Sequence, residues 1–209
     1  MARKLIITIA RQYGSGGREI GEKLSAALGI PVYDKELITE AANMSELHPD
    51  VLHKVDEVAA NSLLYTLAMG SNVFGSAMSF GYKMPVNDKL FLLQSDVIRE
   101  YAAKGSCIII GRCADYVLRD EPNLFRIFIH GDIDCRKARV AERHPDIKST
   151  QVIDIINKTD KRRASYYNFY TGNKWGKYDN YDLMINSSTL GIDETVTFLA
   201  AYAKSMMAE

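Results

Sequence analysis

The sequence contains few cysteines, no excess of either charge and no long apolar run, and each shortage narrows the class of protein. The three cysteines Cys107, Cys113 and Cys135 are odd in number and lack metal-type spacing, which disfavours a disulfide framework or a zinc site. The 26 basic and 26 acidic side chains balance, so neither nucleic acid nor an anionic membrane is expected as a partner. No apolar segment reaches transmembrane length, and the N-terminal apolar run is too short for a signal peptide. These features predict a reduced, cytoplasmic protein.

Hydrophobic periodicity predicts an α/β fold. The 209 residues fit one domain with an ordinary apolar and charged content. Short apolar runs predict strands at 4–9, 30–33, 107–111, 126–130 and 181–186. Helical spacing predicts helices at 17–28, 35–43, 51–69, 90–103, 134–143, 152–170 and 195–206. Strands that alternate with helices form parallel sheets covered on both faces, so ligands are expected beyond the carboxyl ends of the strands.

The strongest functional signal is the first crossover. An apolar strand leads into the turn RQYGSGGRE (11–19), and a helix follows at once. Small residues let a bound phosphate approach the backbone, and the N–H groups of a helix N-terminus face the anion. The usual phosphate loop, or P-loop, reads G-x-x-x-x-G-K-[ST]. Here Arg11 stands where its first glycine belongs and Gly17 where its lysine belongs, so a tight turn that uses glycine for positive φ is the alternative.

Four blocks of sequence, in order over most of the chain, resemble the cytidylate kinase-like family of P-loop proteins. They are ARQYGSGGREIGEKLSAALGIPVYDKELI, IIIGRCADYVLRDEPNLFRIFIHGDIDCRKARV, DKRRASYY and YDLMINSSTLGIDETVTFL. The resemblance implies a three-layer α/β/α domain with a mostly parallel five-stranded sheet, an acceptor-side insertion at 45–87 and a lid region at about 146–178. It also implies an ATP-dependent phosphotransferase that uses Mg²⁺ and passes the γ-phosphoryl group to a nucleoside monophosphate or another small acceptor.

Four departures from the family pattern concern the site. Besides the missing lysine at Gly17, the family's Gly-Arg-Asp triplet reads Gly-Arg-Cys and ends at Cys113, and the lid aspartate is replaced by Ala164. The segment DKELI (34–38) also replaces the motif that opens the monophosphate region of true cytidylate kinases. These changes leave two alternatives open. One is a catalytically silent nucleotide- or phospholigand-binding protein, and the other is a kinase for a non-nucleotide metabolite.

The donor phosphates are expected at the glycine-rich turn. The backbone groups that would hold them belong to Gly14, Ser15, Gly16, Gly17 and Arg18. Arg18, one place after the missing lysine, would supply the positive charge, with a solvent-facing side chain as its alternative. Arg11 is a second candidate cation. Ser15 and Glu19 are the two candidates for contact with Mg²⁺, directly or through water.

The acceptor is expected at the ends of two other strands. Arg112 follows a buried strand and would grip phosphate bidentately, unless it pairs with Asp115 or Asp120. Asp34 would orient or deprotonate the acceptor, or else cap the following helix. Arg162 and Arg163 would close on the transferring group, or else lie on a solvated helix face. Because they are adjacent on a helix, at most one is expected to face the site.

Several further features permit two interpretations. The aromatics near the lid would pack in a core, or one would stack on a base; they are Tyr166, Tyr167, Tyr170 and Trp175. Cys113 is a small buried hydrophobe, or a reactive thiol if Arg112 lowers its pKa. The Met-, Gly- and Ser-rich segment 70–87 is a surface loop or a substrate flap. The middle of the chain is also a candidate homodimer surface.

Overall fold

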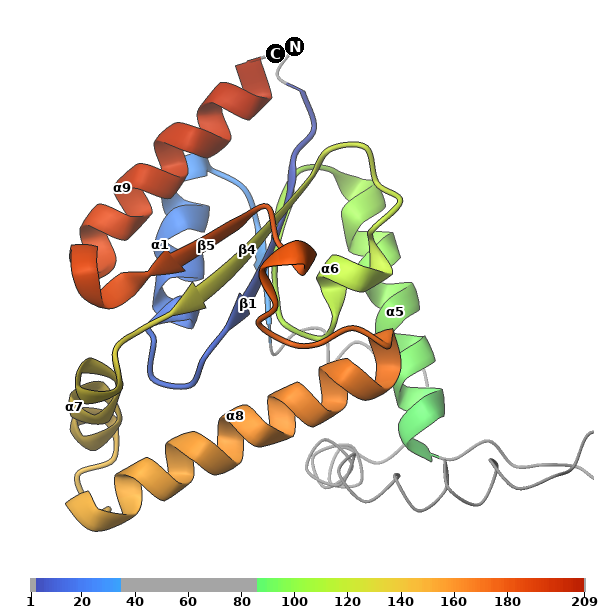
Figure 1. Ribbon diagram of the computed structural model, residues 1–209. Helices are drawn as coiled ribbons and strands as arrows, with labels where there is room; N and C mark the ends of the chain where they lie inside the picture. The colour runs from blue at the N-terminus through green and yellow to red at the C-terminus, as the bar shows by residue number, and fades with distance from the viewer. Residues whose placement is uncertain (1–2, 35–85, 209) are drawn as a thin grey trace, which may run out of the picture.

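The structure, a computed structural model, describes residues 3–34 and 86–208, and these form one parallel sheet with helices on both faces (Figure 1). The strands are β1 (Ile6–Arg11), β2 (Val32–Tyr33), β3 (Cys107–Ile110), β4 (Leu124–His130) and β5 (Leu183–Asn186). Their order is β2-β3-β1-β4-β5, and every neighbouring pair is parallel. The predicted α/β class with a parallel five-stranded sheet is confirmed. The helices expected at 35–43 and 51–69 and most of the insertion at 45–87 lie outside the described residues.

The long helices of the structure lie where the helical spacing of apolar residues predicts them. They are α1 (Gly17–Leu28), α5 (Val86–Lys104), α6 (Ala114–Val117), α7 (Ile133–Arg143), α8 (Ser149–Thr171) and α9 (Ser187–Ala208), with a 3₁₀ turn at Tyr178–Asn180. α1 has the predicted bounds and is followed by Gly29, whose φ of 66° is left-handed. α6 and the 3₁₀ turn were not predicted, because elements this short contain too few residues to show a period. α9 begins at Ser187, earlier than predicted, and includes a non-helical Gly191.

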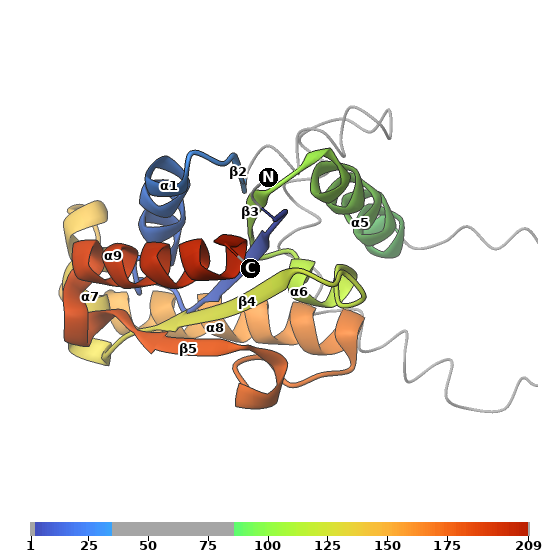
Figure 2. The same cartoon turned by 90° about the horizontal axis from the view of Figure 1, so that it is seen from above.

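One face of the sheet is covered by α1 and α9, which lie side by side (Figure 2). Ile7 and Ile9 of β1 are fully buried in this layer, together with Ile20 and Leu24 of α1 and Leu199 of α9. These strand residues alternate with residues of the opposite face, because side chains along a strand point to opposite sides in turn. The first crossover is therefore fixed to the sheet by the helix that directly follows the glycine-rich turn.

The opposite face is covered by α5 and α6. Ile6 and Ile109 are buried there against Val97 and Ile98 of α5 and Val117 of α6. With both faces covered, β1 and β3 read in the sequence as continuous apolar runs rather than alternating ones. Within residues 3–34 and 86–208, no helix combines the length and the apolar character needed to cross a bilayer.

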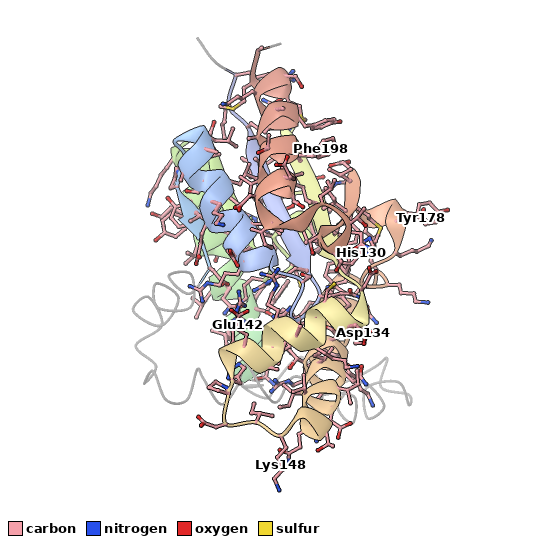
Figure 3. The ribbon with its side chains drawn as sticks, turned by 90° about the vertical axis from the view of Figure 1, so that its left-hand side faces the viewer. His130, Asp134, Glu142, Lys148, Tyr178 and Phe198 are labelled. Carbon is pink, nitrogen blue, oxygen red and sulfur yellow. The ribbon has the colours of Figure 1, made fainter. Side chains whose placement is uncertain are left out.

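The carboxyl ends of the parallel strands form one edge, and α8 runs across this edge (Figure 1). Figure 3 looks onto α7, with Asp134 near its start and Glu142 near its end, and Lys148 marks the residue before α8. α7 and α8 thus lie beyond the end of β4, next to the turn that follows β1. This arrangement places two positively charged helices at the edge where ligands of open α/β sheets bind.

Candidate functional site

The glycine-rich turn between β1 and α1 is held by hydrogen bonds from several parts of the chain. Gln12 continues the strand, since its N–H donates to the carbonyl of Ile129 at 3.0 Å. The N–H of Tyr13 donates to Asp160 Oδ1 at 2.7 Å, and the carbonyl of Tyr13 accepts from Arg136 Nε at 2.8 Å. Arg136 and Asp160 also form an ion pair with each other. The two polar groups of one residue are therefore fixed by α7 and α8.

Glycine is required in this turn by conformation and by space. Gly14 and Gly16 have φ values of 79° and 78°, which disfavour other residues. A Cβ on Gly14 would lie 2.9 Å from the carbonyl oxygen of Arg136. A Cβ on Gly16 would lie 2.3 Å from Ile192 Cδ1. Backbone and side chains of α7 and α9 therefore lie directly against the turn that the sequence assigns to donor phosphates.

The two candidate Mg²⁺ contacts are engaged within the protein. Ser15 is 2% exposed, and its hydroxyl donates to the carbonyl of Gln12 at 2.9 Å. Glu19 forms ion pairs with Lys23, Arg139 and Arg143, at 3.3, 3.2 and 3.5 Å. The described part of the chain contains no group of three or more His, Cys, Asp or Glu side chains arranged to hold a metal ion.

A cavity of about 290 Å³ opens at the carboxyl ends of β1 and β3, beneath α8. Its lining residues are Ala10, Arg11, Asp34, Ile110, Gly111, Arg112, Cys113, Asp115, Thr159, Arg162, Arg163, Tyr166, Tyr167 and Trp175. Five of the predicted site residues are among them, namely Arg11, Asp34, Arg112, Arg162 and Arg163. The turn residues 14–17 and Glu19 are not. Arg18 lies nearby, with Nε 3.7 Å from Asp34 Oδ2.

Both lid arginines line the cavity, whereas the sequence predicts that at most one of them faces the site. Arg163 is half-buried, and its Nη1 donates to the carbonyl of Arg11, at the end of β1, at 2.8 Å. Arg162 is exposed on the cavity rim. Adjacent positions on one helix can therefore both contribute to the wall of this cavity.

The cavity carries an excess of positive charge. Among the described residues, its lining includes four arginines and two carboxylates, Asp34 and Asp115. Burial and the nearby Arg163 lower the pKa of Arg11 to about 9, while Asp34 acts in the opposite direction. Burial also lowers the pKa of Arg163. Mutual repulsion of this kind is unfavourable unless an anion is bound, so the arrangement is suited to hold phosphate or another polyanion.

The residues after β3 adopt a strained conformation. Gly111, Arg112 and Cys113 have φ values of 79°, 57° and 55° in succession. Two consecutive non-glycine residues in the left-handed region are uncommon and tend to cluster at functional sites. The Cys113 thiol is 3% exposed, and burial raises its pKa. The small buried hydrophobe is therefore confirmed, and desolvation disfavours the reactive thiolate.

The aromatic residues of α8 connect this helix to the body of the protein. Tyr167 donates to the buried Asp115 at 2.7 Å, Tyr166 to Gln94 at 3.1 Å and Tyr170 to Asp88 at 3.1 Å. Tyr166, Tyr167 and Trp175 line the cavity, whereas Tyr170 does not. The aromatic cluster thus fixes α8 to α5 and α6 and also forms part of the cavity wall.

Sequence reasoning missed the residues that contact the turn from distant parts of the chain. Asp160 and Arg136, which hold the backbone of Tyr13, come from α8 and α7. Ser187, at the start of α9, donates to the carbonyl of Ser15 at 2.6 Å. In the sequence, Asp160 is only the acidic residue that precedes three basic ones, at positions 161–163. A lone acid at the head of a basic run is a weak signal, and nothing in the sequence indicates which backbone group it meets.

Comparison with known proteins agrees with this architecture. The model of the cytidylate kinase-like family matches residues 6–189, and the chain belongs to this family. A solved structure of an uncharacterized protein from Eubacterium ventriosum ATCC 27560 is 30% identical, with a TM-score of 0.69, over 97% of this chain and 99% of that one. Shikimate kinase from Bacteroides thetaiotaomicron shares the fold at 13% identity, with a TM-score of 0.53 over 96% and 98%. Among curated proteins, none matches the sequence. The fold is that of the P-loop kinases.

Proposed function

We propose that this protein is an ATP-dependent phosphotransferase that passes the γ-phosphoryl group to a small acceptor, a nucleoside monophosphate or another metabolite. The observation that carries the proposal is the cavity lined by four arginines at the carboxyl ends of β1 and β3. Phosphoryl transfer requires little covalent chemistry from the protein, but it requires cations around the transferring group. Membership of a kinase-like family supports the same conclusion.

The proposal gives separate roles to the residues around the cavity. Arg112 would hold the anionic part of the acceptor, because its guanidinium can bind two phosphate oxygens at once. Asp34 would orient or deprotonate the attacking group. Arg162 and Arg163 would stabilise the charge that spreads over the phosphoryl oxygens. The donor phosphates would lie between these side chains and the turn residues 14–17, with Arg18 at the first turn of α1.

The described residues fit a polyphosphate better than they fit a metal ion. Arginines surround the cavity, whereas Ser15 and Glu19 are bonded within the protein. Mg²⁺ commonly keeps several waters and binds through substrate phosphates, so it would enter with the nucleotide. When bound, it would neutralise part of the phosphate charge.

The test is an ATP-consumption screen on the purified protein, with CMP, dCMP, UMP and diverse small alcohols as acceptors in the presence of Mg²⁺. An active acceptor should lose at least about tenfold in kcat/KM when Arg112 is replaced by Ala, because a charge-assisted contact is removed. Arg119→Ala, an exposed arginine outside the cavity, is the matched control. Failure of the wild-type protein to bind Mg-ATP would overturn the proposal.

A second candidate function is binding of a phospholigand without turnover. It is favoured by the position of the turn residues 14–17, which do not line the cavity. Gly14 and Gly16 lie instead against α7 and α9. Calorimetry of Mg-ATP together with a product assay separates the two functions. Saturable binding with no product from any acceptor supports the silent binder, and product formation excludes it.

A further inference from the structure

The side chain of Arg11 fills the space that a side chain at position 17 would need. A Cβ on Gly17 would lie 2.6 Å from Arg11 Cβ and 3.0 Å from Arg11 Cγ, and the shorter of these distances is too close for real atoms. Gly17 is the first residue of α1, and its φ is not positive, so its conformation does not require glycine. It is the side chain of Arg11 that excludes a side chain at position 17.

The far end of Arg11 is accommodated by a second glycine. A Cβ on Gly111 would lie 2.1 Å from Arg11 Nη1. The first carbons of the Arg11 side chain therefore lie next to Gly17, and its guanidinium lies next to Gly111, directly after β3. This guanidinium lines the cavity together with Arg112 and Arg163.

Among the described residues, one carboxylate forms an ion pair with Arg11, and three arginines oppose its charge. Its side chain is 18% exposed, and the carboxylate that pairs with it within residues 3–34 and 86–208, Asp34 Oδ1, is 3.5 Å from Nη2. Arg163, Arg112 and Arg18 all disfavour its protonated form, yet with a pKa of about 9 it remains charged at neutral pH. A half-compensated charge inside a cavity is unfavourable for folding, and such charges concentrate at functional sites.

We propose that Arg11 replaces the lysine of the usual phosphate loop, and that it carries this charge to the donor phosphates from strand β1 rather than from helix α1. The positive charge of Arg11 then compensates for the lysine that is absent at position 17. The ligand class is a polyphosphate, with Mg-ATP as the expected member. This inference rests on the proposed function, and it assigns to Arg11 the role for which Arg18 is the first candidate in the sequence.

A double-mutant cycle tests the exchange. Arg11→Gly removes the cation, Gly17→Lys introduces a lysine that collides with Arg11, and the double variant recreates the pattern G-x-x-x-x-G-K. The readouts are calorimetric binding of Mg-ATP and of pyrophosphate, with circular dichroism and thermal unfolding to verify folding. Arg11→Gln, which keeps most of the side-chain volume, serves if Arg11→Gly does not fold. Arg119→Ala is the control for loss of a surface arginine.

Each single change is expected to weaken binding of both probes by about tenfold or more, the effect of losing a charge-assisted hydrogen bond. The double variant should recover affinity to within about threefold of wild type, so the two changes are strongly non-additive. Unchanged affinity in folded Arg11→Gly or Arg11→Gln, or a double variant as weak as its parents, would overturn the role of Arg11. Arg11-dependent binding without turnover of ATP would overturn the kinase proposal but support this one. Failure of wild type to bind either probe would overturn both.

Discussion

Asp160 accepts a hydrogen bond from the backbone N–H of Tyr13 at 2.7 Å and thereby joins the middle of α8 to the glycine-rich turn after β1. The same carboxylate pairs with Arg136, which in turn donates to the carbonyl of Tyr13. Side-chain exposures of 8% for Arg136 and 17% for Asp160 show that this pair is largely withdrawn from water. The turn is therefore not held by its glycines alone but by a buried ion pair between two helices.

Asp160→Asn is expected to destabilise the protein by about 3 kcal/mol, because it leaves the buried Arg136 without its counter-charge. Urea unfolding followed by circular dichroism measures the change. Asp154→Asn, an exposed acid on the same helix, is the control and should shift stability by less than about 0.5 kcal/mol. Equal effects of the two substitutions would show that the pair contributes nothing beyond surface charge.

Asp115 gives a pH-dependent prediction. Burial raises its pKa above the ordinary value of 3.8, against the hydrogen bond from Tyr167, which lowers it. The folded state then holds this proton more tightly than the unfolded state, so the contribution of Asp115 to stability falls as pH rises through and above 4. Relative to Asp115→Asn, wild type should therefore be most stable in acid and lose that advantage toward neutral pH.

Urea unfolding of wild type and Asp115→Asn at several pH values between 4 and 8 measures this difference. Asp120→Asn, whose carboxylate is exposed, provides the comparison and should show no comparable trend. A stability difference between wild type and Asp115→Asn that stays constant over this range would contradict a raised pKa at Asp115.

The cysteines should divide into one fast and two slow thiols. Cys135 is exposed, whereas Cys107 and Cys113 are buried. Burial raises the pKa of Cys107 to about 11 and also raises that of Cys113, so little thiolate forms at neutral pH. Titration of the native protein with a chromogenic disulfide at pH 8 should show one rapid equivalent, which Cys135→Ser removes. A fast phase that survives this substitution would mean that a buried thiol is accessible.

A polyanion should stabilise the protein more than simple salt does. Binding to the folded state alone raises the free energy of unfolding by about 2.7 kcal/mol at a hundred times the dissociation constant. Thermal unfolding with pyrophosphate, against sodium chloride of equal ionic strength, measures the gain. Arg163→Met should reduce it, because one cavity cation is lost, while Arg119→Ala should leave it intact. If pyrophosphate and chloride act alike, the cavity is not an anion site.

The fold was largely predictable because its elements have clear local signals. The bounds of α1 followed from a strong amphipathic pattern and from Gly29, and the strands were visible as apolar runs. β1 nevertheless extends to Arg11, beyond the predicted end at residue 9, because Arg11 pairs with Ile129 of β4. Hydrophobic periodicity cannot predict that a charged residue extends a strand, because the extension depends on pairing with a distant strand.

The site was predictable in its residue types but not in its geometry. The family resemblance and the strand ends selected Asp34, Arg112 and the lid arginines, and the structure brings all of them to one cavity. The relation between Arg11 and Gly17 was not predictable, because it depends on where one side chain lies across another segment. The roles given to these residues remain predictions until ligand binding is measured.

The anchoring of α8 has a consequence for energetic linkage. Its middle is bonded to the turn after β1 through Asp160, and its later part is bonded to α6 through Tyr167 and Asp115. The same helix thus contributes to the wall of the cavity and to the support of the turn. A ligand that moves α8 when it binds in the cavity must therefore change the affinity of the turn after β1 for its own ligand. By thermodynamic reciprocity, a ligand at the turn must change the affinity of the cavity by the same factor.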